Sequence, residues 1–299
     1  MITKRYRISH STTFTYSSPV TVSQQIVHLM PRETQTQTCL QFSMSVAPQA
    51  VHNEVGEDFF GNPVRYLTLT DDHTLLLILA VSEVEVRTRD LPDPASTMPW
   101  EQVHGFLAND PTDVSHDAVQ YCFDSPHTQW SRDLPSYALQ SFTPGRPFFD
   151  AALDLTRRIH EEFRYDPAVT DVTTPVDEAF DLKAGVCQDL AHVQIACMRS
   201  LGLPVRYVSG YLLTHPPAGE ERMIGADASH AWVSVYCPGP GWIDLDPTNN
   251  LVVSTDHITS AWGRDYADVS PIAGVITGGG SHTVDVSVDV APLEDVLTS

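Results

Sequence analysis

Alternating hydrophobic and polar residues dominate the beginning of the chain. Residues 6–10, 64–69 and 81–86 place an apolar side chain at every second position, which is typical of strands with one buried face. Turn-forming residues separate these stretches, as in the Gly-Asn-Pro run at 61–63. The pattern predicts an N-terminal β domain over residues 1–95.

A polar, proline-rich stretch at residues 90–99 interrupts the alternation, and we take it as the first domain boundary. Residues 96–147 then mix short helical patterns with further prolines and serines. We predict a connector with short helices over this range rather than a separate domain.

Helical periodicity begins near residue 150. Asp150 is predicted as an N-cap, followed by apolar residues at helical spacing: Ala152, Leu155, Ile159 and Phe163. A second helix starts after Gly185 and ends at the Gly-Leu-Pro run 202–204. Its apolar stripe consists of Leu190, Val193, Cys197 and Leu201.

Strand patterns return after this helix. They cover residues 205–213, 230–236, 241–246 and 283–290, the last alternating valine with polar residues. The order of strands, connector, helices and strands predicts an α+β fold. We group residues 148–299 into one unit, which includes the C-terminal strand.

Composition narrows the classes of function. The 299 residues include 38 acidic and 17 basic side chains, which gives a net charge of −21. A surface of this charge repels phosphate groups, so we predict neither nucleic acid nor an anionic membrane as a partner. The longest apolar run, residues 75–81, is too short to cross a bilayer and predicts a buried strand.

Cysteine usage favours a reducing compartment. The five cysteines are widely spaced and odd in number, and none forms a CxxC pair. No apolar segment follows the charged N-terminus, so no signal peptide is recognised. We predict a cytoplasmic protein in which each cysteine is a small buried hydrophobe unless its neighbours indicate otherwise.

Cys187 has such neighbours. It follows Gly185, which permits a tight turn, and it falls in the first turn of the predicted second helix. The unpaired N–H groups and positive dipole end at that place favour a nucleophilic thiolate and can receive an oxyanion. The structural interpretation is kept for the other four: Cys39, Cys122, Cys197 and Cys237.

A histidine and an aspartate provide partners for this thiol. The Cys-Pro-Gly-Pro-Gly run at 237–241 predicts a chain reversal, and a turn centred on its first proline places His230 opposite Asp246. The same register places Trp232 opposite Asp244, and a shift of two residues would exchange the aspartates. Asp246 is preferred because it ends its strand before a proline. A carboxylate there fixes the imidazole tautomer and stabilises the imidazolium.

Other assignments fit less well. His192 follows Cys187 by five residues on the same helix and points elsewhere, so we discount it as a base. No two histidines stand at metal-ligand spacing on one element. The predicted site is therefore Cys187, His230 and Asp246, with no cofactor and no metal.

Several segments together resemble the transglutaminase-like superfamily, in particular its bacterial members described as cysteine proteases. They are Gly-Val-Cys-Gln-Asp at 185–189, the run 199–211, His-Ala-Trp at 230–232 and Trp-Ile-Asp-Leu-Asp-Pro-Thr-Asn at 242–249. Residues 1–86 resemble the β region that precedes the catalytic core in such proteins, and residues 263–271 resemble a segment that follows it.

The resemblance implies a papain-like core, in which a helix bearing the cysteine packs on an antiparallel sheet bearing the histidine and aspartate. It also implies that the family's Cys, His and Asp are Cys187, His230 and Asp246, which favours Asp246 over Asp244. An acyl-thioester then passes to water, giving hydrolysis of a peptide or other amide, or to an amine acceptor. Hydrolysis is preferred here.

Two further classes stay open. One is a biosynthetic acyltransferase that forms an amide with a dedicated amine, and the other is a non-catalytic scaffold, against which the intact Cys/His/Asp set argues. The chain lacks a dense acidic loop resembling the calcium sites of animal transglutaminases.

The N-terminal β domain either binds a partner or covers the core as a structural element, and we favour the structural role.

Overall fold

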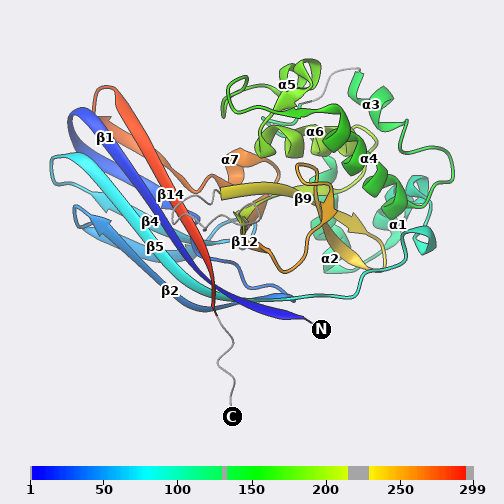
Figure 1. The fold of residues 1–299 in the computed structure, drawn as a ribbon, viewed down its shortest axis with the longest axis horizontal. Helices are drawn as coiled ribbons and strands as arrows, with labels where there is room; N and C mark the ends of the chain where they lie inside the picture. Colours follow the sequence, from blue (N-terminus) through cyan, green and yellow to red (C-terminus); the bar gives the residue numbers. More distant parts are fainter. Residues whose placement is uncertain (1, 130–132, 215–228, 294–299) are drawn as a thin grey trace, which may run out of the picture.

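The computed structural model describes residues 2–129, 133–214 and 229–293. A strand-rich part and a part that contains the helices lie side by side (Figure 1). The strand-rich part is a seven-stranded sheet of order β2-β5-β1-β4-β3, in which β13 and β14 also pair with β1. Its strands are β1 (Thr3–Val27), β2 (Gln37–Ala47), β3 (His52–Glu57), β4 (Pro63–Leu69), β5 (His73–Arg87), β13 (Ile272–Gly278) and β14 (His282–Leu293).

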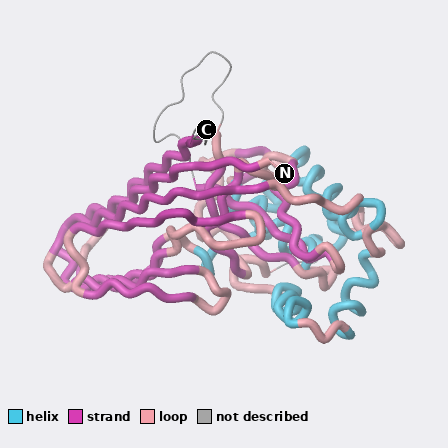
Figure 2. The backbone as a smooth tube through the Cα atoms, turned by 90° about the horizontal axis from the view of Figure 1, so that it is seen from below, coloured by secondary structure: helices cyan, strands magenta, loops and turns pink. Residues whose placement is uncertain are grey.

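Strand β1 is long enough to serve two layers. Its first half pairs with β5 and β14, whereas its second half pairs with β4 and β13. The register shifts between Thr15 and Val20, and the two halves then lie in separate layers (Figure 2). Their alternating apolar side chains share one core, which includes Tyr16, Val20, Val27, Leu67, Leu69, Leu76 and Ile78.

The second part contains a five-stranded antiparallel sheet of order β11-β10-β9-β8-β12. Its strands are β8 (Val205–Leu212), β9 (Ser229–Cys237), β10 (Gly241–Asp246), β11 (Leu251–Val252) and β12 (His257–Gly263). The main helices are α4 (Phe148–Glu162), α5 (Val176–Leu182), α6 (Cys187–Arg199) and α7 (Tyr266–Val269). Helix α6 packs on β8 and β9 and is buried on all sides, so it forms the centre of this part.

The predicted fold class is confirmed: the helix that begins at Cys187 packs on an antiparallel sheet that carries His230 and Asp246. In the sequence, the segment that links the two parts forms short helices. They are η1 (Pro94–Ser96), η2 (Trp100–Gln102), α1 (Val103–Asn109), α2 (Asp113–Val119), η3 (Gln120–Cys122) and α3 (Asp133–Ala138). Buried Arg199 of α6 holds this segment by donating to the carbonyl of Tyr121 and the hydroxyls of Ser125 and Thr128. The connector is therefore part of the helical core.

Three expectations need correction. Helix α4 begins at Phe148 after Pro147, because two buried phenylalanines extend it toward its N-terminus, so Asp150 is not the N-cap. The run 75–81 is not fully buried, since it alternates within β5, with Leu76 buried and Leu75 48% exposed. The C-terminal strand, which we grouped with residues 148–299, pairs with β1 instead.

The two parts share a small hydrophobic core. Side chains of β1, β5 and β14 meet side chains of β8 and β12 there, namely Tyr6, Ile8, Val84, Val86, Val288 and Val290 on one side and Tyr211, Leu213 and Ile258 on the other. The strand-rich part is therefore anchored to the sheet that carries the candidate site. In the described ranges, no helix has the length and apolar character needed to cross a membrane.

Candidate active site

Cys187 is the first residue of α6, as the sequence predicts. Gly185 is needed just before it, because a Cβ there would lie 2.5 Å from a carboxylate oxygen of Asp189. That carboxylate accepts hydrogen bonds from the backbone of Val186 at 2.8 Å and from the hydroxyl of Thr170 at 2.7 Å. The helix start is thus fixed by side-chain contacts, and the thiol belongs to the first turn of α6, where backbone N–H groups lack partners within the helix.

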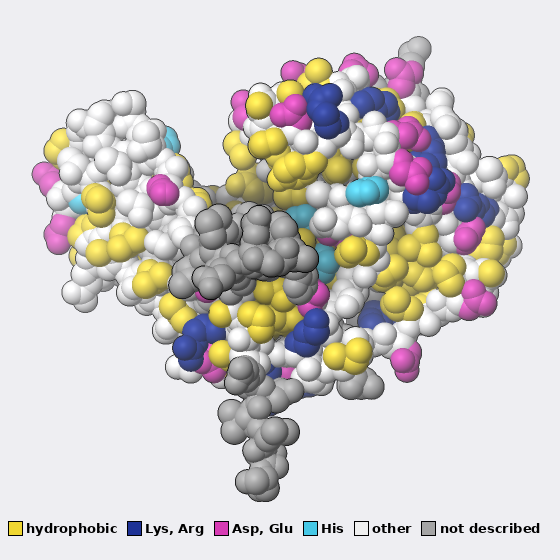
Figure 3. All heavy atoms as spheres, in the orientation of Figure 1, with side chains coloured by type: hydrophobic (Ala, Val, Ile, Leu, Met, Phe, Trp, Pro, Cys, Tyr) yellow, Lys and Arg dark blue, Asp and Glu magenta, His cyan; other side chains and the backbone are white. Residues whose placement is uncertain are grey.

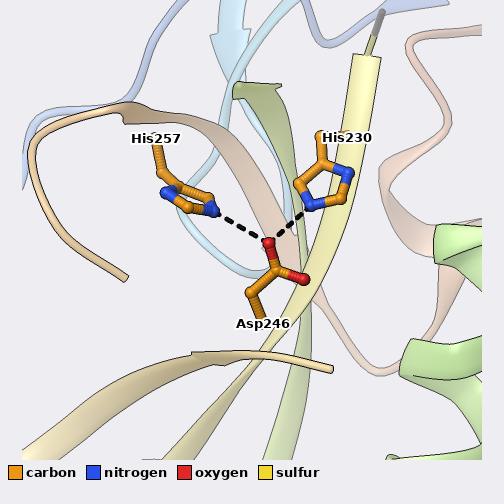
Figure 4. A group of neighbouring side chains, drawn as sticks. All are labelled: His230, Asp246 and His257. Atoms are coloured by element: carbon orange, nitrogen blue, oxygen red, sulfur yellow. Dashed lines mark hydrogen bonds and ion pairs between the residues drawn. The ribbon is translucent and has the colours of Figure 1, made fainter. Parts of the chain in front are cut away.

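His230 lies at the beginning of β9, and Asp246 lies at the end of the neighbouring strand β10. Nε2 of His230 and Oδ2 of Asp246 are 2.8 Å apart, and the Asp246 side chain is fully buried (Figure 4). The other candidate, Asp244, accepts a hydrogen bond from Nε1 of Trp232 at 3.0 Å. Both predicted pairs therefore meet.

The register that predicted these pairs is wrong by two residues. Cys237 pairs with Gly241, and Ser234 pairs with Asp244, so the turn is centred on Gly239. Gly239 has a φ of +91°, which a glycine adopts readily and a proline cannot. His230 and Asp246 meet as diagonal neighbours, a separation that long side chains can bridge.

Asp246 accepts hydrogen bonds on both carboxylate oxygens. Oδ1 accepts the backbone N–H groups of Thr248 and Asn249, at 2.9 and 3.1 Å. Oδ2 accepts from His230, from His257 at 3.0 Å and from the Asn249 side chain at 2.7 Å. Burial alone would raise the pKa of this carboxyl, but the hydrogen bonds from the two histidines outweigh it and hold the pKa far below its usual range.

The ionised Asp246 determines the state of His230. Burial disfavours the imidazolium, but the hydrogen bond and charge of Asp246, with a contribution from Cys187, raise the pKa of His230 from 6.5 to about 9. His230 is thus an imidazolium at neutral pH. Because Nε2 donates to Asp246, the nitrogen left to exchange a proton with Cys187 is Nδ1.

The four cysteines outside the site are raised in pKa by burial. All five are free, and burial raises the pKa of Cys39, of Cys122 and Cys237 to about 11, and of Cys197 to about 12. His192, which we discounted as a base, accepts a hydrogen bond from the backbone of Tyr266 at 3.2 Å. Its pKa falls to about 3 because it is fully buried.

Sequence reasoning missed two side chains of the site. Asn249 follows Asp246 in an Asp-Pro-Thr-Asn turn, a local signal that could have identified it. His257 begins β12, which is separated from β9 by β8. No local pattern predicts that strand order, so His257 could not be placed from the sequence.

His230, Asp246 and His257 are also residue types that bind transition metals, and their ligand atoms lie within 4.8 Å of one another. Both imidazole nitrogens, however, point directly at one carboxylate oxygen, at 2.8 and 3.0 Å. That is hydrogen-bond geometry, whereas metal ligands converge on a point between them. The arrangement fits two N–H donors on one carboxylate better than it fits a resident metal.

Family models match both parts of the chain. The model described as the bacterial transglutaminase-like N-terminal region matches residues 6–85, and that of the transglutaminase-like superfamily matches residues 135–247, which include Cys187, His230 and Asp246. The uncharacterized protein Rv2569c of Mycobacterium tuberculosis is 39% identical over 303 residues, spanning 98% of this chain and 94% of the relative. The chain belongs to the transglutaminase-like superfamily.

Two further proteins share part of the sequence or the fold. The protein-glutamine gamma-glutamyltransferase of Pseudomonas aeruginosa is 35% identical over 97 residues, which is 31% of this chain and 14% of that protein. The solved structure of "a Putative Cysteine Protease from Cytophaga hutchinsonii" superposes with a TM-score of 0.75 at 22% identity, covering 100% of this chain and 93% of that one. The shared fold therefore extends over the whole chain.

Proposed function

We propose that this protein is a thiol enzyme that acts on amide bonds, with Cys187 as nucleophile, His230 as acid and base, and Asp246 as the group that orients His230. One observation carries the proposal: a buried, ionised Asp246 holds Nε2 of His230 and leaves Nδ1 for a cysteine at the start of a helix. The raised pKa of His230 keeps an imidazolium beside the cysteine at neutral pH, and a neighbouring imidazolium favours the thiolate form of a cysteine.

The steps conserve atoms and charge. The Cys187 sulfur attacks the substrate carbonyl carbon, and the oxyanion is received by N–H groups of the first turn of α6. The C–N bond breaks as Nδ1 of His230 gives its proton to the leaving amine, which leaves an acyl-thioester on the sulfur. Water then attacks the thioester, its proton returns to His230, the C–S bond breaks and the carboxylic acid departs.

Hydrolysis of a peptide or another amide is the reaction we propose first. The Cytophaga hutchinsonii protein that shares the fold bears the description "a Putative Cysteine Protease", which supports this choice. Transfer to an amine is the second candidate, supported by the stretch shared with the gamma-glutamyltransferase. It needs only an amine in place of water at the second step.

The charge of the molecule bears on partners and location. Acidic side chains are spread over the face drawn in Figure 3 rather than gathered in one patch. We propose a peptide or amide as the substrate. Because the net charge of the protein is −21, we expect no nucleic acid and no anionic membrane as a partner. A cytoplasmic location also remains a prediction, supported by the five free cysteines.

The test is incubation of the wild type and of Cys187→Ala with a diverse peptide mixture, with and without an added primary amine. New termini detected by mass spectrometry, absent with the variant, establish hydrolysis, whereas amine-linked products establish transfer. If wild type and variant leave every peptide unchanged in both conditions, the general amide reaction is refuted, and a scaffold or a narrow biosynthetic acyltransferase is favoured.

A further inference from the structure

His257 is a second imidazole on the carboxylate that orients His230. It begins β12 at the edge of the five-stranded sheet, and its side chain is only 3% exposed. Nε2 lies 3.0 Å from Oδ2 of Asp246, opposite His230 (Figure 4), and the ring packs edge-on against Trp232 at 5.2 Å. Nothing in the reaction proposed above uses this side chain.

The surroundings of His257 define its protonation. An ionised carboxylate accepts hydrogen bonds and donates none, so Nε2 of His257 carries a proton. Its other nitrogen, Nδ1, is buried and has no hydrogen-bond partner among the described residues. A proton on Nδ1 would be a buried donor without an acceptor, which is costly. Among the described residues, the side chain of His257 therefore has one hydrogen bond, and that bond holds Asp246.

We propose that His257 is a positioning residue, which holds Oδ2 of Asp246 in the orientation that accepts the Nε2 proton of His230 and so keeps Nδ1 directed at Cys187. This proposal rests on the function proposed above. Without the His257 donor, the carboxylate keeps its two backbone contacts on Oδ1, but its Oδ2 side is held only by His230 and Asn249. The carboxylate of Asp246 can then rotate together with the His230 ring instead of holding that ring in place.

The strand that carries His257 is itself held from outside the catalytic sheet. The buried Gln37 amide accepts from the backbone N–H of Thr259 at 2.8 Å and donates to its carbonyl at 2.7 Å. The buried Asn62 amide makes the same pair of contacts with Trp262, at 2.9 and 2.8 Å. Two side chains of the N-terminal part thus pair with part of the free edge of β12, as a neighbouring strand would.

A similar contact fixes the residue before His257. Asp256 accepts hydrogen bonds from Lys4 at 2.6 Å and from the hydroxyl of Tyr6 at 3.0 Å, and both donors lie on β1. These contacts hold the chain next to a histidine that stands at the very beginning of a strand. They also give the N-terminal part a structural role in the site.

The experiment compares four variants of the full chain: His257→Leu, His257→Gln, His257→Asn and His230→Ala. The readout is the rate of Cys187 alkylation by iodoacetamide at neutral pH, resolved by peptide mass spectrometry. The glutamine amide reaches the position of Nε2, whereas the asparagine amide reaches only that of Nδ1, which contacts no acceptor. Both amides are polar, so the pair separates the hydrogen bond from general polarity.

We expect His257→Leu and His257→Asn to slow alkylation roughly 10- to 100-fold, the size of effect seen when the hydrogen-bond partner that orients a metal-binding histidine is removed. His257→Gln should restore the rate to within a few-fold of the wild type. The matched control is His10→Leu, which removes another buried histidine bonded to a tyrosine and a threonine hydroxyl, at 3.1 and 3.0 Å. Because that tyrosine, Tyr211, belongs to the core that joins the two parts, a second control is His73→Leu, at a buried histidine of β5 whose Nδ1 lies 2.7 Å from the carbonyl oxygen of Asp71. His73→Leu should lower the melting temperature and leave the alkylation rate unchanged.

Three results would overturn the proposal. If all His257 variants react like the wild type while His230→Ala is slow, only the role of His257 is wrong. If glutamine is as slow as leucine, the ring shape rather than the hydrogen bond matters, and again the positioning role fails. If His230→Ala reacts as fast as the wild type, the thiol mechanism fails and the role of His257 fails with it.

Discussion

Replacement of Asp246 by asparagine tests the proposed mechanism at its buried charge. All five hydrogen bonds to this carboxylate come from donors, and an asparagine has only one acceptor oxygen. The two backbone N–H groups on Oδ1 cannot change character, whereas a histidine can move its proton to the other nitrogen. The amide nitrogen should therefore face the histidines and force the His230 proton onto Nδ1.

The magnitude follows from the raised pKa of His230. An increase from 6.5 to about 9 corresponds to about 3 kcal/mol in favour of the imidazolium. Loss of that preference removes the partner that stabilises a thiolate on Cys187, and 3 kcal/mol is about 100-fold in an equilibrium constant. Because Cys187 contributes part of the raised pKa, we expect Asp246→Asn to slow Cys187 alkylation at neutral pH by up to about this factor.

The assay is the pH profile of peptide-resolved iodoacetamide labelling, from below 6.5 to above 9. The wild-type rate should depend less on pH between these limits than the rate of Asp246→Asn, because the imidazolium of His230 favours the thiolate until the pH passes about 9. The Asp246→Asn rate should rise steadily with pH, as for unassisted thiols.

The control is Asp244→Asn, on the same strand. Its remaining carbonyl oxygen can still accept the hydrogen bond of Trp232, so the wild-type profile is expected. A wild-type profile for Asp246→Asn, or equal losses for the two variants, would refute the reasoning.

Three further predictions concern stability, measured as the free energy of unfolding in urea. The pKa of His230 in the folded protein lies above its ordinary value, so the stability that its charge contributes is complete below pH 6.5 and is lost as the pH rises through about 9. The free energy of unfolding of the wild type, relative to His230→Gln, should therefore fall by about 3 kcal/mol across that pH range. A difference that stays constant with pH would contradict the raised pKa. Val288→Asp places a charge in the shared core, at 1% exposure, and should cost roughly 3–5 kcal/mol, whereas Val286→Asp, 52% exposed, should change little. Gly210→Ala should cost roughly 1–3 kcal/mol, because its Cβ would lie 2.1 Å from a carbonyl oxygen of β12. Gly105→Ala should instead stabilise the protein by about 0.5–1 kcal/mol, because this glycine lies within α1 and a Cβ there meets no other atom. Equal effects of the two substitutions would show that the close contact at Gly210 is relieved without strain.

The helix start at Cys187 could be predicted because its determinants are local. A glycine before an apolar helical pattern marks the turn, and the close approach of Asp189 to Gly185 shows why a side chain is excluded there. The hairpin between His230 and Asp246 was also local. Its register was wrong because both Pro238 and Gly239 were possible turn centres, and only the positive φ of Gly239 decides between them. The correct partners survived that error because diagonal neighbours remain within side-chain reach.

The remainder depended on contacts that no local pattern encodes. The alternation at residues 283–290 predicted a strand correctly, but not that it pairs with the first strand of the chain. For the same reason His257 escaped notice, since its place beside Asp246 depends on β12 lying at the outer edge of β8. Sheet order is set by burial of whole faces, and a sequence shows which residues prefer burial without showing against which neighbour.

These non-local contacts bear on the two roles considered for the N-terminal β domain. An exposed edge strand normally presents unpaired backbone groups to solvent or to another chain. On β12, Gln37 and Asn62 fill part of that edge with side-chain amides, and the shared core behind it joins Tyr6 to Tyr211. The N-terminal domain thus already uses polar and apolar side chains to contact the strand that carries His257. The structural role is thus favoured over the recruitment of a partner through this surface.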